Sequence, residues 1–459
     1  MNIMKNLQTK NYIQFGIGLL LIFASLAAVA FFGSFKDAVW IDKTTPPPWI
    51  ILWVLLSIIA AASVGMTLIF EQKSYAISIS RFFTGILFTF SGFVKAVDPL
   101  GSNYKFIDYF GAWNMDFLAP TALTLGIIMS TAELLVGLCL LFKIYPKLSS
   151  LGALIFMLGF TPVTLYLAFQ QNITGKELVH DCGCFGDALV LTNWQTFVKN
   201  IFILVPVAFL FFYRKKIQPS LTPVFSLIAT IVLTLSIVGL SAYALIHLPP
   251  IDFRPYKIGT QLLSEDCGQT LAPTTKTYMY ADFINNQTGE RKEFEITENY
   301  PDWEIWDIDT LKPYRNEVIR LKSEEKIFKL DPFFVSSQNR EDYTCEVITD
   351  TSFVFLMVQY DIKTSCTKNA QAINALYSWA QQHDFAFYGL TASLNEDVEI
   401  FRTKTGAQYE FLSADPIALK TIVRANPGLV VLRNGVVIAN WNGNDIPPIA
   451  KFEKMVGKK

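Results

Sequence analysis

The sequence predicts an α-helical membrane bundle of seven spans, followed by a water-soluble α/β domain with a small β-rich insert. The chain of 459 residues is 52% hydrophobic and only 17% charged, whereas charged residues make up about a quarter of ordinary globular chains. The charges are also unevenly divided, with 15 Lys/Arg and 10 Asp/Glu before residue 251 but 23 and 29 from there on. The first half is therefore apolar and mildly basic, and the second half is acidic.

Seven apolar runs are each long enough to cross a bilayer, which takes about 20 residues. Four of them contain no charged residue, and the others carry isolated charges at Arg81, Lys95, Glu133 and Lys199. The first run is too long for the apolar core of a signal peptide, so we expect a span there as well. We place the spans near residues 13–34, 49–70, 78–97, 119–142, 148–170, 194–213 and 223–247.

The basic residues predict the orientation, because cytoplasmic loops are enriched in Lys and Arg. With a cytoplasmic N-terminus, nine basic residues fall on the inner side, including the run 214–216, against four in the short outer loops. An odd number of spans then places the second half outside the cytoplasm. We therefore expect a multi-pass protein of the bacterial inner membrane, embedded in the lipid bilayer, with a periplasmic C-terminal domain. The scattered basic residues exclude a nucleic-acid footprint.

These features divide the chain into five parts. Pro249-Pro250 marks a stiff exit from the last span, since proline interrupts helix hydrogen bonding. The parts are two N-terminal spans (1–77), a four-helix core (78–213), the seventh span with the exit linker (214–251), a β-rich segment (252–349) and an α/β domain (350–459).

The loop between the fifth and sixth spans reads His180-Asp181-Cys182-Gly183-Cys184. Fully extended, two cysteines one residue apart stand up to about 7 Å apart, just beyond the disulfide range, and Gly183 allows the backbone to bend and close the gap. A disulfide in so small a ring should be easily reduced. We therefore favour a redox-active pair, while a purely structural disulfide and half of a metal site stay open. No metal is predicted, because His180 and two thiolates lack an obvious fourth ligand.

This motif, which continues with Phe185-Gly186, resembles the signature of MauE/DoxX-type redox-associated membrane proteins. The stretches 91–99 (SGFVKAVDP) and 132–137 (AELLVG) resemble the same family, and the resemblance covers about residues 78–213. It implies a four-helix bundle linked to thiol–disulfide or quinone-dependent redox work. Members of the family are tied to the maturation of disulfide-rich periplasmic enzymes and to thiosulfate oxidation. A quinone is therefore the expected cofactor, with Glu133 and Lys95 as the residues that would bind it.

Glu133 falls near the middle of its span, where an ionised side chain costs at least about 2.5–3.5 kcal/mol. A carboxyl at that depth can pass a proton to or from a quinone, or hydrogen-bond to another helix, and both roles stay open. Lys95 lies at the outer end of its span and can extend to the interface. An ion pair between Lys95 and Glu133 is therefore not assumed.

The second half begins with short alternating apolar and polar runs, which are typical of strands, over residues 252–345. Cys267 and Cys345 in this segment can form a disulfide or stay separate. From about residue 352, strands expected at 352–361 and 385–391 alternate with helices at 367–383 and 396–406. The chain ends in a hairpin around Asn434-Gly435 and a helix near 447–456.

This order resembles a thioredoxin fold over about residues 350–459, with Pro427 at the position of that family's cis-proline. The family has a Cys-x-x-Cys pair, but here Cys366 stands alone. Either Cys366 is the second of the pair and Lys363 replaces the first, or Cys366 is the first and Asn369 replaces the second. The flanking lysines Lys363 and Lys368 favour a thiolate at Cys366. Cys366 can therefore exchange with the loop cysteines or a client, or the domain can be kept for binding alone.

These observations predict a membrane thiol–disulfide oxidoreductase whose active groups are Cys182, Cys184, Glu133 and Cys366. Electrons would pass to or from a quinone, and the soluble half would engage a periplasmic client protein. The alternative is a non-catalytic membrane scaffold or assembly subunit, which uses a degenerate thioredoxin-like domain to bind a larger envelope complex. Cys139 is expected to be an inert apolar filler.

Overall fold

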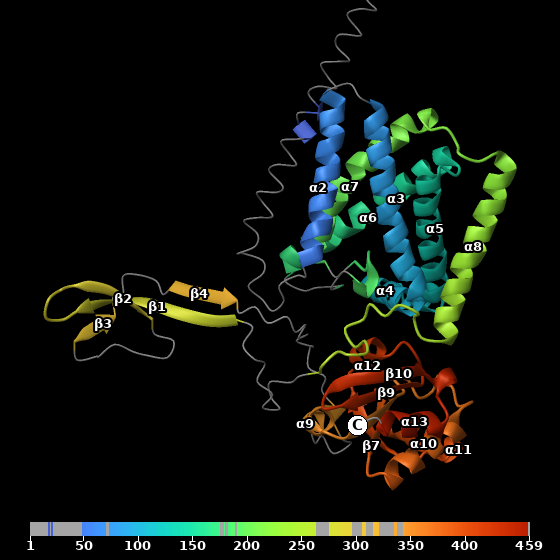
Figure 1. The fold of residues 1–459 in the computed structure, drawn as a ribbon, viewed down its shortest axis with the longest axis vertical. Coiled ribbons are helices and arrows are strands. Elements are labelled where there is room, and N and C mark those ends of the chain that lie inside the picture. Colours follow the sequence, from blue (N-terminus) through green and yellow to red (C-terminus); the bar gives the residue numbers. More distant parts are fainter. Residues whose placement is uncertain are drawn as a thin grey trace, which may run out of the picture.

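The first half of the chain forms a helical bundle, and the C-terminal α/β domain lies at the end of the bundle that carries α4 (Figure 1). The computed structural model describes residues 17–18, 20–21, 48–69, 73–174, 179, 182–188, 191–262, 275–295, 305–308, 315–320, 335–336 and 343–457.

Five helices among the described residues are long and apolar enough to cross a membrane. They coincide with the last five expected spans, and α2 (Pro48–Ile69) coincides with the second. The first expected span falls almost entirely outside the described residues, so the total of seven stays a prediction. The five are α3 (Lys73–Val97), α5 (Ala122–Phe142, preceded by the 3-10 helix η1 at Asp116–Thr121), α6 (Pro146–Thr174), α7 (Asn193–Tyr213, followed by η3 at Arg214–Lys216) and α8 (Pro223–Ile246).

Helices α3 and α5 approach each other through glycines. A Cβ at Gly92 would collide with the backbone of Leu134, and one at Gly137 would collide with the backbone of Thr89. Small residues let helix backbones pack closely where lipid supplies no hydrophobic driving force. The contact sets the distance between α3 and α5, and therefore between the polar side chains that each helix carries.

Arg81 joins the same two helices at their other end. Its guanidinium donates to the carbonyl oxygens of Leu140 at 2.9 Å and Leu141 at 2.7 Å, in the last turn of α5. Carbonyls in the last turn of a helix lack the usual partner four residues further on, and a cation is favourable at a helix C-terminus. Arg81 is therefore a structural residue.

Residues Pro99–Ala112 form a helix, α4, where the sequence predicts an outer loop. The Asp98 carboxylate accepts a hydrogen bond from the backbone N–H of Gly101 at 3.0 Å, and Pro99 occupies the first turn. An Asp cap followed by proline is a recognised helix start. The helix covers the end of the bundle that faces the C-terminal domain (Figure 1).

The C-terminal domain is built on a six-stranded sheet in the order β10-β9-β6-β7-β8-β5. The pairs β6–β7 and β7–β8 are parallel, and the others are antiparallel. The expected strands, helices and terminal hairpin are present, whereas β5, β8, α9 and α12 were not expected. The elements are β5 (Val335–Ser336), α9 (Thr344–Thr349), β6 (Phe353–Val358), α10 (Ala370–Gln382), β7 (Ala386–Thr391), α11 (Asn395–Thr405), β8 (Glu410–Ala414), α12 (Pro416–Ile422), β9 (Gly428–Arg433), β10 (Val436–Asn442) and α13 (Ile449–Val456).

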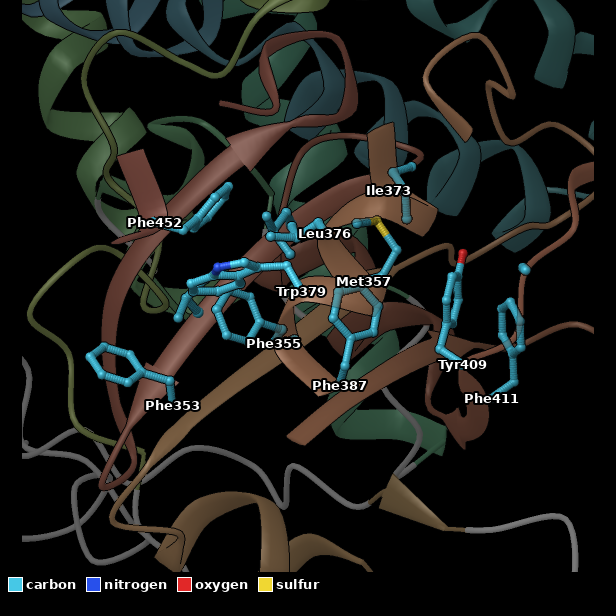
Figure 2. Close-up of a cluster of buried hydrophobic side chains, with 14 of the residues drawn as sticks. Phe353, Phe355, Met357, Ile373, Leu376, Trp379, Phe387, Tyr409, Phe411 and Phe452 are labelled. Atoms are coloured by element: carbon cyan, nitrogen blue, oxygen red, sulfur yellow. The ribbon is translucent and has the colours of Figure 1, made fainter. Parts of the chain in front are cut away.

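Both faces of this sheet are buried. In β6 the side chains of Phe353, Phe355 and Met357 enter one core cluster, while Val354, Leu356 and Val358 enter the other. Figure 2 shows the first cluster, in which aromatic side chains from the sheet meet helices α10 and α13. Burial on two faces explains why this strand is continuously apolar rather than alternating.

The β-rich segment forms a separate sheet of four strands. Strand β1 (Thr275–Asn285) pairs antiparallel with β2 (Arg291–Glu295), β3 (Trp306–Ile308) and β4 (Arg315–Arg320). Cys345 is disulfide-bonded, and Cys267 lies outside the described residues.

Candidate functional site

The loop between α6 and α7 holds a disulfide between Cys182 and Cys184, whose Cα atoms are 5.5 Å apart. This separation is within the range that disulfides prefer. Gly183 makes the bend possible with a φ of +64°, a conformation that L side chains rarely adopt. The Tyr109 hydroxyl of α4 donates to the Cys182 carbonyl at 3.1 Å, which ties the loop to the bundle. His180 and Asp181 lie outside the described residues.

Ser91 connects this loop to the interior of the bundle. Its Oγ lies 2.5 Å from the Cys184 carbonyl oxygen and 2.6 Å from Oε1 of Glu133. A hydroxyl has one proton, so it can donate to only one of these two acceptors at a time. A proton on Glu133 would complete a chain in which Glu133 donates to Ser91 and Ser91 donates to Cys184.

Lys95 and Glu133 form a buried ion pair, which the sequence analysis did not assume. The Lys95 Nζ lies 2.7 Å from Oε2 of Glu133, and the two side chains are only 11% and 8% exposed. The same ammonium donates to Ser91 Oγ at 3.3 Å. The expectation that Lys95 extends to the interface was wrong, because α3 and α5 are close enough for its long side chain to reach the carboxylate.

The C-terminal domain contacts this end of the bundle through Arg424, which is 4% exposed. Its Nε lies 2.9 Å from Oδ2 of Asp98, and its Nη2 lies 2.6 Å from Oδ2 of Asp187. Burial alone would lower the pKa of Arg424, but the two carboxylates outweigh this and raise it above its ordinary value. Asp187 lies three residues beyond Cys184, so this Arg424 cluster (Arg424, Asp98 and Asp187) links the domain directly to the disulfide loop.

A pair of tyrosines lies beside the Arg424 cluster. The Tyr104 hydroxyl of α4 donates to the Tyr360 hydroxyl at 3.3 Å, and the guanidinium of Arg424 lies 5.4 Å from the centre of the Tyr104 ring. Burial raises the pKa of Tyr104 well above its usual value, and the neighbouring Tyr360 adds to the effect. Tyr104 therefore stays a neutral hydrogen-bond donor.

Cys366 is exposed and unpaired, and precedes α10 by four residues. Its backbone N–H donates to the carbonyl oxygen of Asn426 at 3.1 Å, and the Asn426-Pro427 peptide bond is cis. Lys363, expected to favour a Cys366 thiolate, is instead 3.1 Å from Asp397. The structure therefore places Cys366 beside the Asn426-Pro427 bond.

Cys139 and two histidines, His247 and His383, take ordinary places. Cys139 is a free, buried cysteine in α5. His247 pairs with Asp445 of the C-terminal domain at 2.8 Å, which adds another contact between the two parts of the chain. His383 ends α10.

The residues proposed for a quinone do not fit one in this arrangement. Both oxygens of Glu133 are engaged, one by Lys95 and the other by Ser91. The cavity beside Lys95 measures about 30 Å³ and is lined by Asp98, Lys105, Gly183 and Arg254, among others. Small-molecule sites measure about 300–1,000 Å³, so this cavity has room for water but not for a quinone ring.

Sequence reasoning missed Ser91 and Arg424. Ser91 precedes Lys95 by four residues, which places both on one face of a helix, and this spacing was an available signal. Arg424 carried no such signal, since its partners Asp98 and Asp187 are 326 and 237 residues away along the chain.

The fold and the site define a multi-pass membrane protein with a disulfide at the end of its bundle and a docked α/β domain. Residues 73–213, from the start of α3 to the end of α7, match the family described as methylamine utilisation protein MauE. The MauE part of the expected resemblance is therefore confirmed for this segment. No curated protein and no solved structure matches the chain.

Proposed function

We propose that the protein is a MauE-type membrane thiol–disulfide oxidoreductase, in which the Cys182–Cys184 disulfide exchanges with the thiols of a periplasmic client. The observation that carries this proposal is the position of the disulfide. It lies where the bundle meets the C-terminal domain, and Ser91 joins it to a buried ion pair. A disulfide that served only to hold a loop would not need this polar connection into an apolar bundle.

The exchange has two balanced steps. A client thiolate attacks one loop sulfur, a client–cysteine bond forms, and the other loop cysteine leaves as a thiolate. A second client thiol then loses its proton and attacks the mixed disulfide. The client loses two electrons and two protons and gains a disulfide, and the loop gains both and becomes a dithiol. The reverse sequence reduces a client disulfide.

Glu133 is the group that would hold a proton during this cycle. When Glu133 is protonated, it donates a hydrogen bond to Ser91, and the Ser91 hydroxyl then donates its own hydrogen bond to the Cys184 carbonyl. When ionised, it competes with that carbonyl for the Ser91 proton. The state of the carboxyl is thereby coupled to the loop backbone. The predicted quinone enters none of these steps.

We assign the C-terminal domain as thioredoxin-like, and in this role it would select the client. The strand order, the cis bond at Pro427 and the position of Cys366 beside it support this assignment. Its contacts with the bundle lie on the same side of the domain, because Arg424 precedes Pro427 by three residues. The domain would therefore hold a client close to the disulfide loop.

Trapping tests the exchange directly. In the full-length protein in native membranes, the wild-type disulfide should exchange with a two-cysteine peptide in its dithiol form. Cys184→Ser should leave Cys182 as a free thiol that attacks the disulfide form of the same peptide and forms a covalent adduct, with one peptide thiol released, and Cys182→Ser should do the same at Cys184. Mass spectrometry after alkylation should find the wild-type pair both as dithiol and as disulfide. A pair that is never reduced in native membranes, and variants that form no adduct, would contradict the proposal.

Ser91→Ala tests the connection to the buried ion pair. It removes the hydroxyl that both Glu133 and Cys184 use, so exchange with the peptide should slow by about tenfold while the cysteines remain present. Ser80→Ala is the matched control, since Ser80 is also buried in α3 but its hydroxyl has no partner among the described residues. Equal rates in the two variants would show that Ser91 has no part in exchange.

A scaffold is the second candidate function, and one contact favours it. Asn369, at the position of a second thioredoxin cysteine, donates to the Gly443 carbonyl at 2.7 Å and so has a structural role. A domain without a dithiol suits binding better than catalysis. A scaffold should still support its envelope complex when Cys182 and Cys184 are both changed to serine, whereas an oxidoreductase should fail with either change.

A further inference from the structure

Lys199 of α7 is a buried lysine that the proposed exchange does not yet use. It is 3% exposed, and its Nζ lies 4.4 Å from the centre of the Phe185 ring, in the residue that follows Cys184. Within the described part of the chain its ammonium makes no hydrogen bond and no ion pair. It does interact electrostatically with Lys95 and Glu133.

The charges that the structure describes around Lys199 do not cancel. Lys95 and Glu133 neutralise each other at 2.7 Å, so no described carboxylate is left as a counter-ion for Lys199. Of the other groups at the loop, Asp187 is paired with Arg424, and the aliphatic chain of Lys105 packs on Gly183. An uncompensated charge inside an apolar bundle is expensive, so an anion formed nearby would stabilise the Lys199 ammonium.

Reduction of the disulfide supplies such an anion. The disulfide is neutral, but exchange expels one loop cysteine as a thiolate, and both Cys182 and Phe185 are buried. A cation close to a thiolate stabilises it, and does so most strongly where water is excluded.

We propose that Lys199 is the counter-charge for the thiolate that forms when the Cys182–Cys184 disulfide opens. It acts across the Phe185 ring as a positioning residue, through its electric field. The Lys199 charge is therefore balanced when the loop is reduced and carries a thiolate, and is not balanced when the loop is oxidised. This inference rests on the proposed function, since it gives Lys199 a role only if the disulfide opens.

The test is the pH dependence of cysteine alkylation in the full-length, reduced protein. Because thiolates react and thiols do not, Lys199→Met should slow alkylation of the loop pair by about tenfold at neutral pH and move the profile to higher pH. Lys199→Arg should stay within about threefold of wild type, because it keeps the charge. The alkylation rate of the exposed Cys366 in the same samples is the internal control, because it shows that the reagent is equally active in each sample.

Lys216→Met is the matched control variant. Lys216 also lies over an aromatic ring, 5.3 Å from the centre of Tyr213, but it is exposed and at the other end of the helix. It should leave the profile unchanged. In a glutathione titration, Lys199→Met should also populate the dithiol about tenfold less, which corresponds to a potential about 30 mV lower.

The outcomes separate the two proposals. If wild type exchanges with the dithiol peptide but Lys199→Met has the wild-type profile, Lys199 is not the counter-charge. If wild type does not exchange at all, the proposed function fails first. The oxidised Lys199→Met protein should also be at least as stable as wild type, because an unmatched charge is removed. A strong destabilisation would mean that Lys199 already has an anion, and this also overturns the inference.

Discussion

The Nη2 of Arg424 lies 2.6 Å from Oδ2 of Asp187, and so joins the C-terminal α/β domain to the loop that carries the disulfide. The same guanidinium reaches Asp98, where α3 ends and α4 begins. One side chain thereby holds three parts of the chain together. Arg254 joins the linker to the domain, because it donates to the carbonyl of Ile422 at 3.1 Å and pairs with Asp252 at 2.6 Å.

Arg424→Met should release the domain from the bundle. Removing one partner from a buried ion cluster costs about 3–5 kcal/mol, because Asp98 and Asp187 lose their counter-charge. Hydrogen exchange of α4 and of residues 182–188 should then become roughly a hundredfold faster, which corresponds to about 3 kcal/mol. Hydrogen-exchange mass spectrometry of the full-length protein measures this.

Arg402→Gln is the control for Arg424→Met. Arg402 pairs with Glu399 inside the domain, and both side chains are partly exposed, at 31% and 63%. Such pairs contribute about 0–1 kcal/mol. Protection of α4 should therefore be unchanged in Arg402→Gln, and an equally small effect of Arg424→Met would show that the ion cluster does not hold the domain.

Alkaline pH should weaken the protein through three buried or half-buried tyrosines. Burial raises the pKa of Tyr104, Tyr388 and Tyr409 above the value of about 10 that they have in an unfolded chain. The folded state then binds more protons than the unfolded state, so the stabilisation is complete below about pH 10 and is lost as the pH rises further. At about pH 11 these phenols stay protonated in the native protein.

Absorbance at 295 nm, which reports tyrosinate, measures this difference. Native protein should absorb less than the same protein in guanidinium at about pH 11, and the free energy of unfolding should fall from about pH 10 upwards. Tyr104→Phe should reduce the dependence on pH. Identical native and denatured tyrosinate titrations would rule out the burial effect.

Local sequence signals predicted most of the fold. Apolar runs identified α2, α3 and the helices from α5 to α8, and the Asn434-Gly435 turn identified the terminal hairpin. The helix α4 was missed although Asp98-Pro99 carries a cap and a first-turn proline, because its mixed composition resembles that of a loop. Local patterns are sufficient where one segment determines its own conformation.

The candidate site was only partly predictable, for a different reason. Cys182 and Cys184 are separated only by Gly183, so their bond could be expected from the local sequence. The partners of Glu133 and Arg424 depend on how whole helices and domains pack, and that information is not local. The close α3–α5 contact at Gly92 is what brings Lys95 to Glu133.

Changing Lys95 and Glu133 separately should be more damaging than changing them together. Lys95→Met leaves a buried carboxylate without a counter-charge, and Glu133→Gln leaves a buried ammonium, so each should cost about 3–5 kcal/mol. The double variant removes both charges and should recover most of that loss. Unfolding of the purified protein in detergent gives the free energies for a double-mutant cycle.

The double-mutant cycle also shows whether Lys95 and Glu133 act as a pair or contribute to stability independently. A coupling energy of about 2 kcal/mol or more is expected for side chains in contact. Lys147→Met, at an exposed position of α6, should change stability by less than about 0.5 kcal/mol. Additive effects of the two single changes would mean that Lys95 and Glu133 do not form the pair in the membrane.

Gly183→Ala should shift the loop towards its dithiol form. Gly183 has a φ of +64°, and an added Cβ would lie 3.0 Å from Cγ of Lys105. The positive φ costs an L residue about 1–2 kcal/mol, and the oxidised loop cannot avoid it because the disulfide holds the bend. The reduced loop can relax, so the oxidised form bears the larger penalty. A glutathione titration read out by alkylation should show about tenfold more dithiol, which corresponds to a potential about 30 mV higher.

Gly159→Ala in α6 is the control for Gly183→Ala. An added Cβ at Gly159 meets nothing within 4 Å, so this variant should titrate as wild type does. If Gly183→Ala does the same, the left-handed bend is not specific to the oxidised loop.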